Sequence, residues 1–221
     1  YRRKLLSPVE VAQACLARIA RWNDRVGAFC LVDEVGALAA ARASEQRWRR
    51  GEPLGVADGV PAGIKDLILV RGWPLRRGSL STAGLPPSAE DAPATARLRE
   101  AGAVLLGSTA TPEFGWKAVT DGPLGPTACN PWDTTRTAGG SSGGAAVAVA
   151  LGMGALHVGT DGGGSIRIPA SFTGIVGLKP TFGRVPAWPL SPFGTVAHLG
   201  PMTRTVEDAA LLLTVLSRPD A

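Results

Sequence analysis

Residues 139–165 read GGSSGGAAVAVALGMGALHVGTDGGGS, and this stretch decides the fold. From Gly143 to Leu151 the residues are small and apolar, which predicts a buried helix. From Ala155 to Gly159 they predict a short buried strand. One glycine–serine cluster precedes the helix and another follows the strand, so a helix–strand unit could bring the two clusters together.

Helices and strands alternate on both sides of this unit. The start SPVE at residues 7–10 combines an N-cap serine, a proline at the first helical position and a capping-box glutamate. Residues 121–140 are predicted to be loop because prolines interrupt any pattern. Alternating strands and helices predict an α/β fold around a largely buried sheet. The other predicted elements are helices over 35–49, 94–101 and 205–216, and strands within 56–70, over 103–107 and over 175–178.

The composition is that of a globular protein. The 221 residues are 45% hydrophobic and 19% charged, enough for a sizeable core in one large domain or two small ones. The formal net charge of +5 is mild for this length, so we expect a solvated surface and no nucleic-acid partner. The three cysteines lie far apart, which fits neither a disulfide framework nor a metal site.

Two stretches bear on membranes and location. The basic residues within 1–6 are not followed by an apolar core, so no signal peptide is predicted. The uncharged stretch over 137–160 is dense in glycine and hydroxyl side chains, whereas a membrane span needs about 20 predominantly apolar residues. We therefore expect a cytoplasmic protein with no membrane partner.

The second glycine–serine cluster has the features of a nucleophile site. A serine at the end of a glycine turn, such as Ser165, would expose its hydroxyl. The backbone N–H groups of Gly162, Gly163 and Gly164 would be free nearby to stabilise the oxyanion of a tetrahedral intermediate. The alternative interpretation is that both clusters are flexible loops without chemistry.

A serine nucleophile needs a base, and the chain offers few candidates. His157 lies in an apolar strand and is expected to pack, whereas His198 lies in a predicted loop beside Gly200-Pro201. Lys65 interrupts an apolar stretch, where burial could lower its pKa. Lowering the free value of ~10.4 by roughly 3 units costs about 4 kcal/mol. An ion pair of Lys65 with a buried carboxylate, Asp66 or another, explains the position equally well.

These segments together resemble the amidase signature family. The resemblance is dense in two runs, TAGGSSGG at 137–144 and TDGGGSIRIPASFTGIVGLKP at 160–180. It covers nearly the whole chain. Shorter landmarks similar to the family's are GVP at 59–61, IKD at 64–66, TPEF at 111–114, NPWD at 130–133 and GPMTRT at 200–205.

The resemblance implies a Ser–cis-Ser–Lys triad. Carried over residue by residue, Lys65 is the base, Ser141 is the serine of the cis peptide bond and Ser165 is the nucleophile. The N–H groups around Gly162 to Ser165 would form the oxyanion hole. The resemblance implies no cofactor and no metal.

Three further residues support this network in the same interpretation. Ser142 and Asp161 would orient the triad. Arg167, between apolar neighbours, is expected to be buried in a structural ion pair rather than to clamp substrate.

The resemblance also implies the architecture: a mixed β-sheet core covered by helices on both faces. Family members usually extend beyond the length of this chain, so we expect residues 1–221 to be a single amidase signature domain truncated at its C-terminal side.

The implied function is an amidase that hydrolyses a carboxamide to carboxylic acid and ammonia or amine through a Ser165 acyl-enzyme. The substrate would be a small amide, and a homodimer is left open. One alternative is the glutaminase (A) subunit of a tRNA-dependent amidotransferase, although residues 185–196 lack that subunit's usual tyrosine-containing segment. Another is an inactive fragment. A nucleotide-binding module is a further alternative, but the chain lacks Gly-Lys-Ser/Thr at the required position.

Overall fold

A computed structural model describes residues 1–219 and contains one six-stranded sheet in the order β1-β3-β2-β6-β8-β7. Strand β2 pairs in parallel with both β3 and β6, whereas the pairs β1–β3, β6–β8 and β7–β8 are antiparallel. The sheet is therefore mixed, as expected. Its strands are β1 (Phe29–Val32), β2 (Pro61–Lys65), β3 (Val104–Thr109), β6 (Leu156–Asp161), β7 (Val176–Gly177) and β8 (His198–Thr203).

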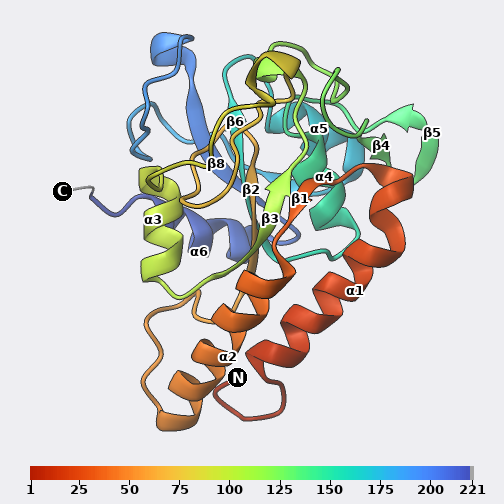
Figure 1. The fold of residues 1–221 in the computed structure, drawn as a ribbon. Coiled ribbons are helices and arrows are strands. Elements are labelled where there is room, and N and C mark those ends of the chain that lie inside the picture. Colours follow the sequence, from red (N-terminus) through yellow and green to blue (C-terminus); the bar gives the residue numbers. More distant parts are fainter. Residues whose placement is uncertain (220–221) are drawn as a thin grey trace.

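Helices cover both faces of this sheet (Figure 1). Helices α1, α2 and α4 pack on one face, and α3 and α6 pack together on the other. The predicted architecture is therefore confirmed. The α-helices are α1 (Pro8–Val26), α2 (Glu34–Arg50), α3 (Pro93–Glu100), α4 (Gly143–Ala150), α5 (Arg167–Thr173) and α6 (Val206–Leu216), and the short 3-10 turns are η1 (Leu80–Thr82), η2 (Glu113–Gly115) and η3 (Gly194–Val196).

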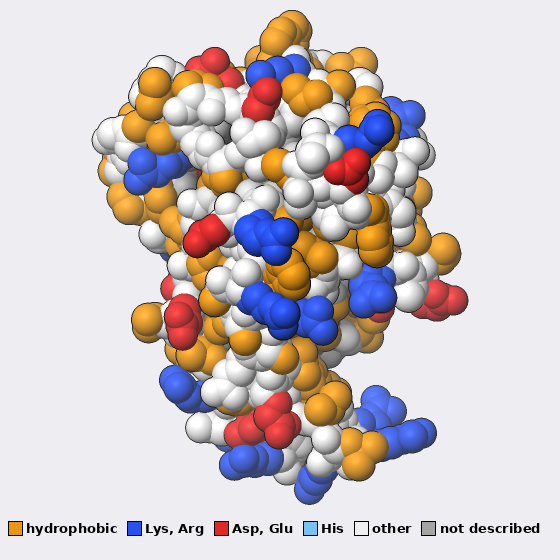
Figure 2. Space-filling model, turned by 90° about the vertical axis from the view of Figure 1, so that its right-hand side faces the viewer, with side chains coloured by type: hydrophobic (Ala, Val, Ile, Leu, Met, Phe, Trp, Pro, Cys, Tyr) orange, Lys and Arg blue, Asp and Glu red, His pale blue; other side chains and the backbone are white. Residues whose placement is uncertain are grey.

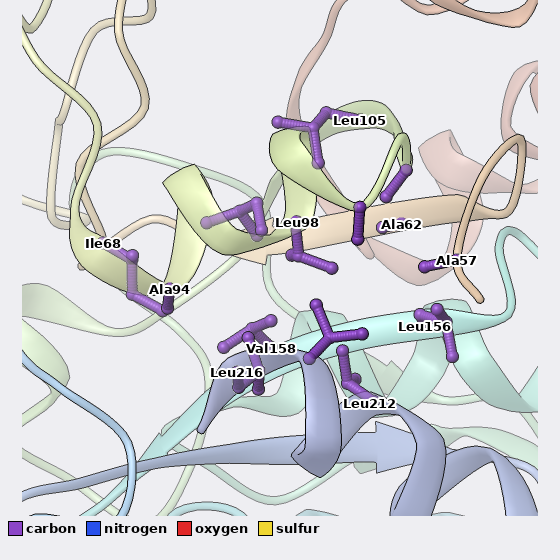
Figure 3. Close-up of a cluster of buried hydrophobic side chains, with 14 of the residues drawn as sticks. Ala57, Ala62, Ile68, Ala94, Leu98, Leu105, Leu156, Val158, Leu212 and Leu216 are labelled. Atoms are coloured by element: carbon purple, nitrogen blue, oxygen red, sulfur yellow. The ribbon is translucent and has the colours of Figure 1, made fainter. Parts of the chain in front are cut away.

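Each face of the sheet has its own hydrophobic core, and β3 contributes to both. Val104 and Leu106 face the core beneath α1, α2 and α4, whereas Leu105 faces the opposite core. Figure 3 shows this second core, where side chains from α3 and α6 meet those of β2 and β6. Successive side chains of β3 therefore alternate between the face covered by α4 and the face covered by α3 and α6.

Local signals in the sequence explain where the first helix begins and ends. At its start, the Glu10 N–H donates to Ser7 Oγ over 3.1 Å and the Ser7 N–H donates to Glu10 Oε2 over 2.8 Å, which forms the predicted capping box. At its end, Gly27 adopts φ 62°, a left-handed conformation that glycine accepts without steric penalty.

The structure differs from the sequence predictions in five segments. Residues 121–140 contain a hairpin of β4 (Cys129–Asn130) and β5 (Asp133–Thr137), whose strands are short and largely exposed and so lack the apolar alternation that marks a buried strand. The strand within 56–70 ends at Lys65, and the chain turns immediately after it. Strands β1 and β8 and helix α5 were not predicted, because β1 has only four residues and because glycine or proline interrupts the patterns of β8 and α5.

The surface seen in Figure 2 carries basic side chains interspersed with acidic and apolar ones. Among the described residues, no helix is both long enough and apolar enough to cross a membrane. All three cysteines are free thiols.

His157 lies fully buried in β6, as its apolar context predicted. Its ring packs against Phe29, with 6.1 Å between ring centroids, and beside the backbone of Gly63 and Gly154. Neither ring nitrogen has a hydrogen-bond partner within residues 1–219. Burial lowers the pKa of His157 to about 3, and the nearby Met153 main chain offsets only part of that effect.

This burial predicts acid sensitivity. The unfolded chain takes up a proton on His157 near pH ~6.5, whereas the folded chain does so only near pH 3, so stability falls as the pH drops through this window. Between pH 7 and pH 5, the free energy of unfolding should fall by about 2 kcal/mol more in the wild type than in His157→Leu, measured by chemical denaturation. His198→Leu, which removes the other histidine, should retain the wild-type difference. An equal drop in His157→Leu and the wild type would contradict this assignment.

Candidate active site

Lys65 is the last residue of β2 and is fully buried on the side of the sheet that faces α4. Three hydroxyl oxygens surround its amine: Nζ lies 2.7 Å from Ser141 Oγ, 2.9 Å from Ser142 Oγ and 2.9 Å from Thr160 Oγ1. Ser141 and Ser142 directly precede α4, and Thr160 lies near the end of β6. The structure therefore brings together the predicted base and both serines of the first cluster.

No carboxylate pairs with Lys65 in the described part of the chain, so the ion-pair interpretation is wrong. The carboxylate of Asp66 instead accepts the main-chain N–H of Arg76 over 3.0 Å and that of Gly78 over 3.4 Å. Burial lowers the pKa of Lys65 well below its usual value, and the charge of Asp161 opposes that effect only in part. Burial also raises the pKa of Asp66 to about 6 despite its main-chain hydrogen bonds.

Ser142 is the most constrained of the three hydroxyl groups. Its hydroxyl donates to the main-chain oxygen of Thr160 over 3.1 Å and accepts the Thr160 N–H over 3.2 Å. The preceding Gly140–Ser141 peptide bond is cis. Sequence reasoning missed Thr160 as a site residue; the only signal was a hydroxyl side chain at the end of a buried strand, next to Asp161.

Asp161 fixes the shape of the second glycine–serine cluster. Its buried carboxylate pairs with Arg167, whose Nε lies 2.9 Å from Oδ2 and whose Nη2 lies 3.0 Å from Oδ1. It also accepts the N–H of Gly164 over 2.8 Å and that of Ile166 over 3.2 Å. Burial alone would raise the pKa of Asp161, but the Arg167 guanidinium and the main-chain donors lower it to about 2.

Arg167 forms the expected structural ion pair, but the expectation that it is buried is wrong. Its side chain is 54% exposed, because the guanidinium reaches the carboxylate from the solvent side of the loop. The flanking apolar residues therefore did not indicate the direction of this side chain.

The glycine turn leaves a set of free donors around Ser165. The Gly164 N–H, one of the three predicted oxyanion donors, already binds Asp161. Within residues 1–219, the N–H groups of Gly162, Gly163 and Ser165 and the Ser165 hydroxyl make no hydrogen bond. The Ser142 N–H donates to the Ser165 main-chain oxygen over 3.1 Å, so the two clusters are in direct contact.

Ser165 opens onto a surface hollow, together with Gly162 and Gly163. The indole of Trp116 and the ring of Phe193 border this hollow and stack on each other, with 5.2 Å between their centroids. A reacting carbonyl could therefore reach the Ser165 hydroxyl and the free N–H groups from solvent.

Neither histidine supports a Ser-His-Asp arrangement. His198 lies in β8 rather than in a loop, and its Nδ1 lies 2.7 Å from the main-chain oxygen of Val196 and 3.1 Å from that of Asp161. It contacts no carboxylate in the described residues, and His157 is in the core. In the same residues, no three His, Cys, Asp or Glu side chains gather as metal ligands.

Comparison with known proteins identifies the family. A family model described as Amidase matches residues 10–221. The chain belongs to the amidase signature family. One solved structure that matches this amidase-family chain is described as a crystal structure of amidase; it is 44% identical and has a TM-score of 0.87 over 96% of this chain and 48% of that one.

Two further solved structures show the same fold. A bacterial aryl acylamidase belonging to the amidase signature enzymes family is 37% identical, with a TM-score of 0.88 over 99% of this chain and 46% of its own. A 6-aminohexanoate cyclic dimer hydrolase complexed with substrate is 34% identical, with a TM-score of 0.90 over 99% of this chain and 45% of its own.

Curated relatives of this chain include subunits of an amidotransferase. The A subunit of glutamyl-tRNA(Gln) amidotransferase from Myxococcus xanthus is 48% identical over 97% of this chain and 44% of its own length. The protein of the same name from Chloroflexus aggregans is 45% identical over the same shares. The chain thus spans a little under half the length of the curated relatives it matches.

Close packing at Gly140 yields a test of how the first cluster is held. A Cβ atom at Gly140 would lie 2.6 Å from the Val119 carbonyl carbon and 2.8 Å from the Val119 nitrogen, both rigid main-chain atoms. Gly140→Ala should therefore lower the free energy of unfolding by about 1–3 kcal/mol or more. Gly84→Ala is the matched control, because nothing lies within 4 Å of a Cβ there. Equal stability of the two variants in chemical denaturation would refute this packing.

Proposed function

We propose that this chain carries the catalytic machinery of an amidase, with Ser165 as nucleophile, Ser141 as proton relay and Lys65 as base. The observation that carries the proposal is the fully buried Lys65 amine, surrounded by three hydroxyl groups at 2.7 to 2.9 Å. A charged amine buried without a carboxylate is unfavourable, so the surroundings favour the neutral amine, which can accept a proton.

The hydrogen bonds around Lys65 orient its lone pair. The hydroxyl proton of Ser142 is already donated to the Thr160 main-chain oxygen, so Ser142 Oγ can only accept from Nζ. A neutral amine has two protons, and Thr160 Oγ1 accepts the second. The lone pair then faces the remaining neighbour, Ser141, whose hydroxyl has no other partner among the described residues.

The first half of the reaction forms an acyl-enzyme. Ser165 Oγ attacks the amide carbonyl while its proton passes to Ser141 and the Ser141 proton passes to Lys65. The N–H groups of Gly162, Gly163 and Ser165 stabilise the oxyanion of the tetrahedral intermediate. Collapse breaks the carbon–nitrogen bond, and the leaving amine takes the proton from Lys65 through Ser141.

The second half consumes water. The same relay removes a proton from a water molecule as its oxygen attacks the acyl carbon. Cleavage of the ester then returns the proton to Ser165 Oγ and releases the carboxylic acid. Ser141 and Ser165 make no hydrogen bond to each other in this structure. The proposal therefore requires the Ser165 side chain to turn toward Ser141 when substrate binds. The reaction draws on Ser142, Thr160 and Asp161 for positioning.

The substrate in this proposal is a small carboxamide. Residues 1–221 act as one amidase signature domain, because the strand that ends at Lys65 pairs with the strand that leads into the glycine turn. Solved relatives named as amidase and aryl acylamidase support this assignment.

A second candidate function is the glutaminase reaction of an amidotransferase. The specific observation in its favour is the identity of 45–48% with relatives named as the A subunit of glutamyl-tRNA(Gln) amidotransferase. Such a protein would release ammonia from glutamine together with partner subunits. Ammonia release from glutamine by this protein alone would count against dependence on partners.

Covalent labelling tests the nucleophile. Exposure to an alkyl fluorophosphonate should add a single adduct to the protein, because an activated Ser165 Oγ displaces fluoride from phosphorus. The adduct should be absent in Ser165→Ala and present in the control Ser171→Ala, a serine exposed on α5. Intact-mass spectrometry measures both. An adduct on Ser165→Ala would show that another residue is the nucleophile.

The pH dependence of labelling tests the base. Only neutral Lys65 accepts a proton, so the labelling rate should rise with pH through the pKa of Lys65 and then level off. Because burial lowers that pKa, the plateau should begin well below pH ~10.4. Lys65→Met should lose the rising limb and react about 10²–10⁴-fold more slowly. Lys4→Met, which changes an exposed lysine, should keep the wild-type profile. An unchanged profile in Lys65→Met would remove lysine from the mechanism.

A further inference from the structure

We propose that Arg77 binds a carboxylate at the far end of the acyl group, so that the preferred substrate is the monoamide of a short dicarboxylic acid. This inference rests on the proposed amidase function and names the substrate class of the same site. Its basis is a guanidinium that has no partner within residues 1–219 and that lines a largely apolar cavity beside the glycine turn.

The cavity has a volume of about 160 Å³ and joins the turn to Arg77. Gly162, which carries a free N–H, lies at the turn, and Arg77 lines the same cavity. Most of the wall between them is apolar, with Leu67, Phe114 and Leu190 among its side chains. A cavity of this size and lining suits an acyl chain of a few carbon atoms.

The Arg77 guanidinium has no partner among the described residues. Its side chain is half-buried, and within residues 1–219 its guanidinium makes no ion pair and no hydrogen bond. Glu113 accepts the Ser79 hydroxyl over 2.7 Å and Glu90 accepts the Trp188 indole N–H over 3.1 Å, and neither forms an ion pair with Arg77. A partly buried cation without a counter-charge is unfavourable, so an anionic ligand would be drawn to it.

The main chain around Arg77 is held in place. Its main-chain oxygen accepts the Phe114 N–H over 2.8 Å, and the neighbouring N–H groups of Arg76 and Gly78 donate to the carboxylate of Asp66. Arg77 itself has φ 53°, a left-handed conformation that is uncommon for a residue other than glycine. The guanidinium therefore extends from a fixed point rather than from a loose loop.

The chemistry of the wall selects among anions. A guanidinium presents parallel N–H donors that match a carboxylate, and the apolar wall favours methylene groups between that carboxylate and the amide. Asp161, the acidic residue on the wall, is bonded to Arg167 and has no free capacity to pair with an ammonium group. The cavity therefore favours a simple monoamide anion over a zwitterionic amino-acid amide such as glutamine.

The test is calorimetry on the Ser165→Ala protein, which binds without turnover. Its ligands are the monoamides of succinic, glutaric and adipic acid, each compared with the neutral amide in which methyl replaces the carboxylate. At least one monoamide should bind about tenfold to a hundredfold more tightly than its neutral partner. Adding Arg77→Met should abolish that difference, Arg77→Lys should retain part of it, and Arg71→Met, an exposed arginine in the same segment, should leave it intact.

The outcomes separate this inference from the proposed function. If no monoamide binds more tightly than its neutral partner, or if Arg77→Met weakens both equally, the inference is overturned even where labelling of Ser165 succeeds. If Arg77-dependent binding is found but Ser165 takes up no fluorophosphonate, the anion site stands and the proposed reaction fails. Unchanged thermal unfolding of Arg77→Met shows that its effect on binding is not a loss of fold.

Discussion

The burial of the Lys65 amine among hydroxyl groups is the constraint on which the rest of the site depends. A lysine at the end of a central strand cannot reach water, and no carboxylate within residues 1–219 neutralises it. Its neighbours must therefore supply hydrogen bonds at fixed positions. They come from the end of β6, which pairs with β2, and from the start of α4, which packs over both strands.

Close packing of α4 makes this meeting possible. A Cβ at Gly144 would lie 2.3 Å from the Ala110 nitrogen and 2.4 Å from the Ala28 oxygen, so only glycine allows the helix to approach the sheet this closely. The small residues of α4 are thus structural requirements. They let the serines that precede the helix reach an amine held inside the sheet.

The sequence predicted the central unit well, because its signals are local. Helices α1 and α4 and strand β6 follow from caps and apolar runs. The roles of Lys65, Ser141 and Ser165 come from the family motifs and stay predictions. Long-range geometry decided the rest. Thr160 lies beside Lys65, the Gly164 N–H donates to Asp161, and the Arg167 side chain points toward solvent. These contacts join segments in ways that spacing along the chain does not encode.

The hydrogen bonds of the Ser142 hydroxyl limit how protons can move between the side chains of the site. Because the Ser142 hydroxyl donates its proton to the Thr160 main-chain oxygen, it accepts a hydrogen bond from the Lys65 amine but has no proton to give to it. In the proposed mechanism, a proton that reaches Lys65 leaves through Ser141, the serine by which it entered. Under that mechanism, the buried amine is the end point of the proton path and carries one positive charge during each half-reaction.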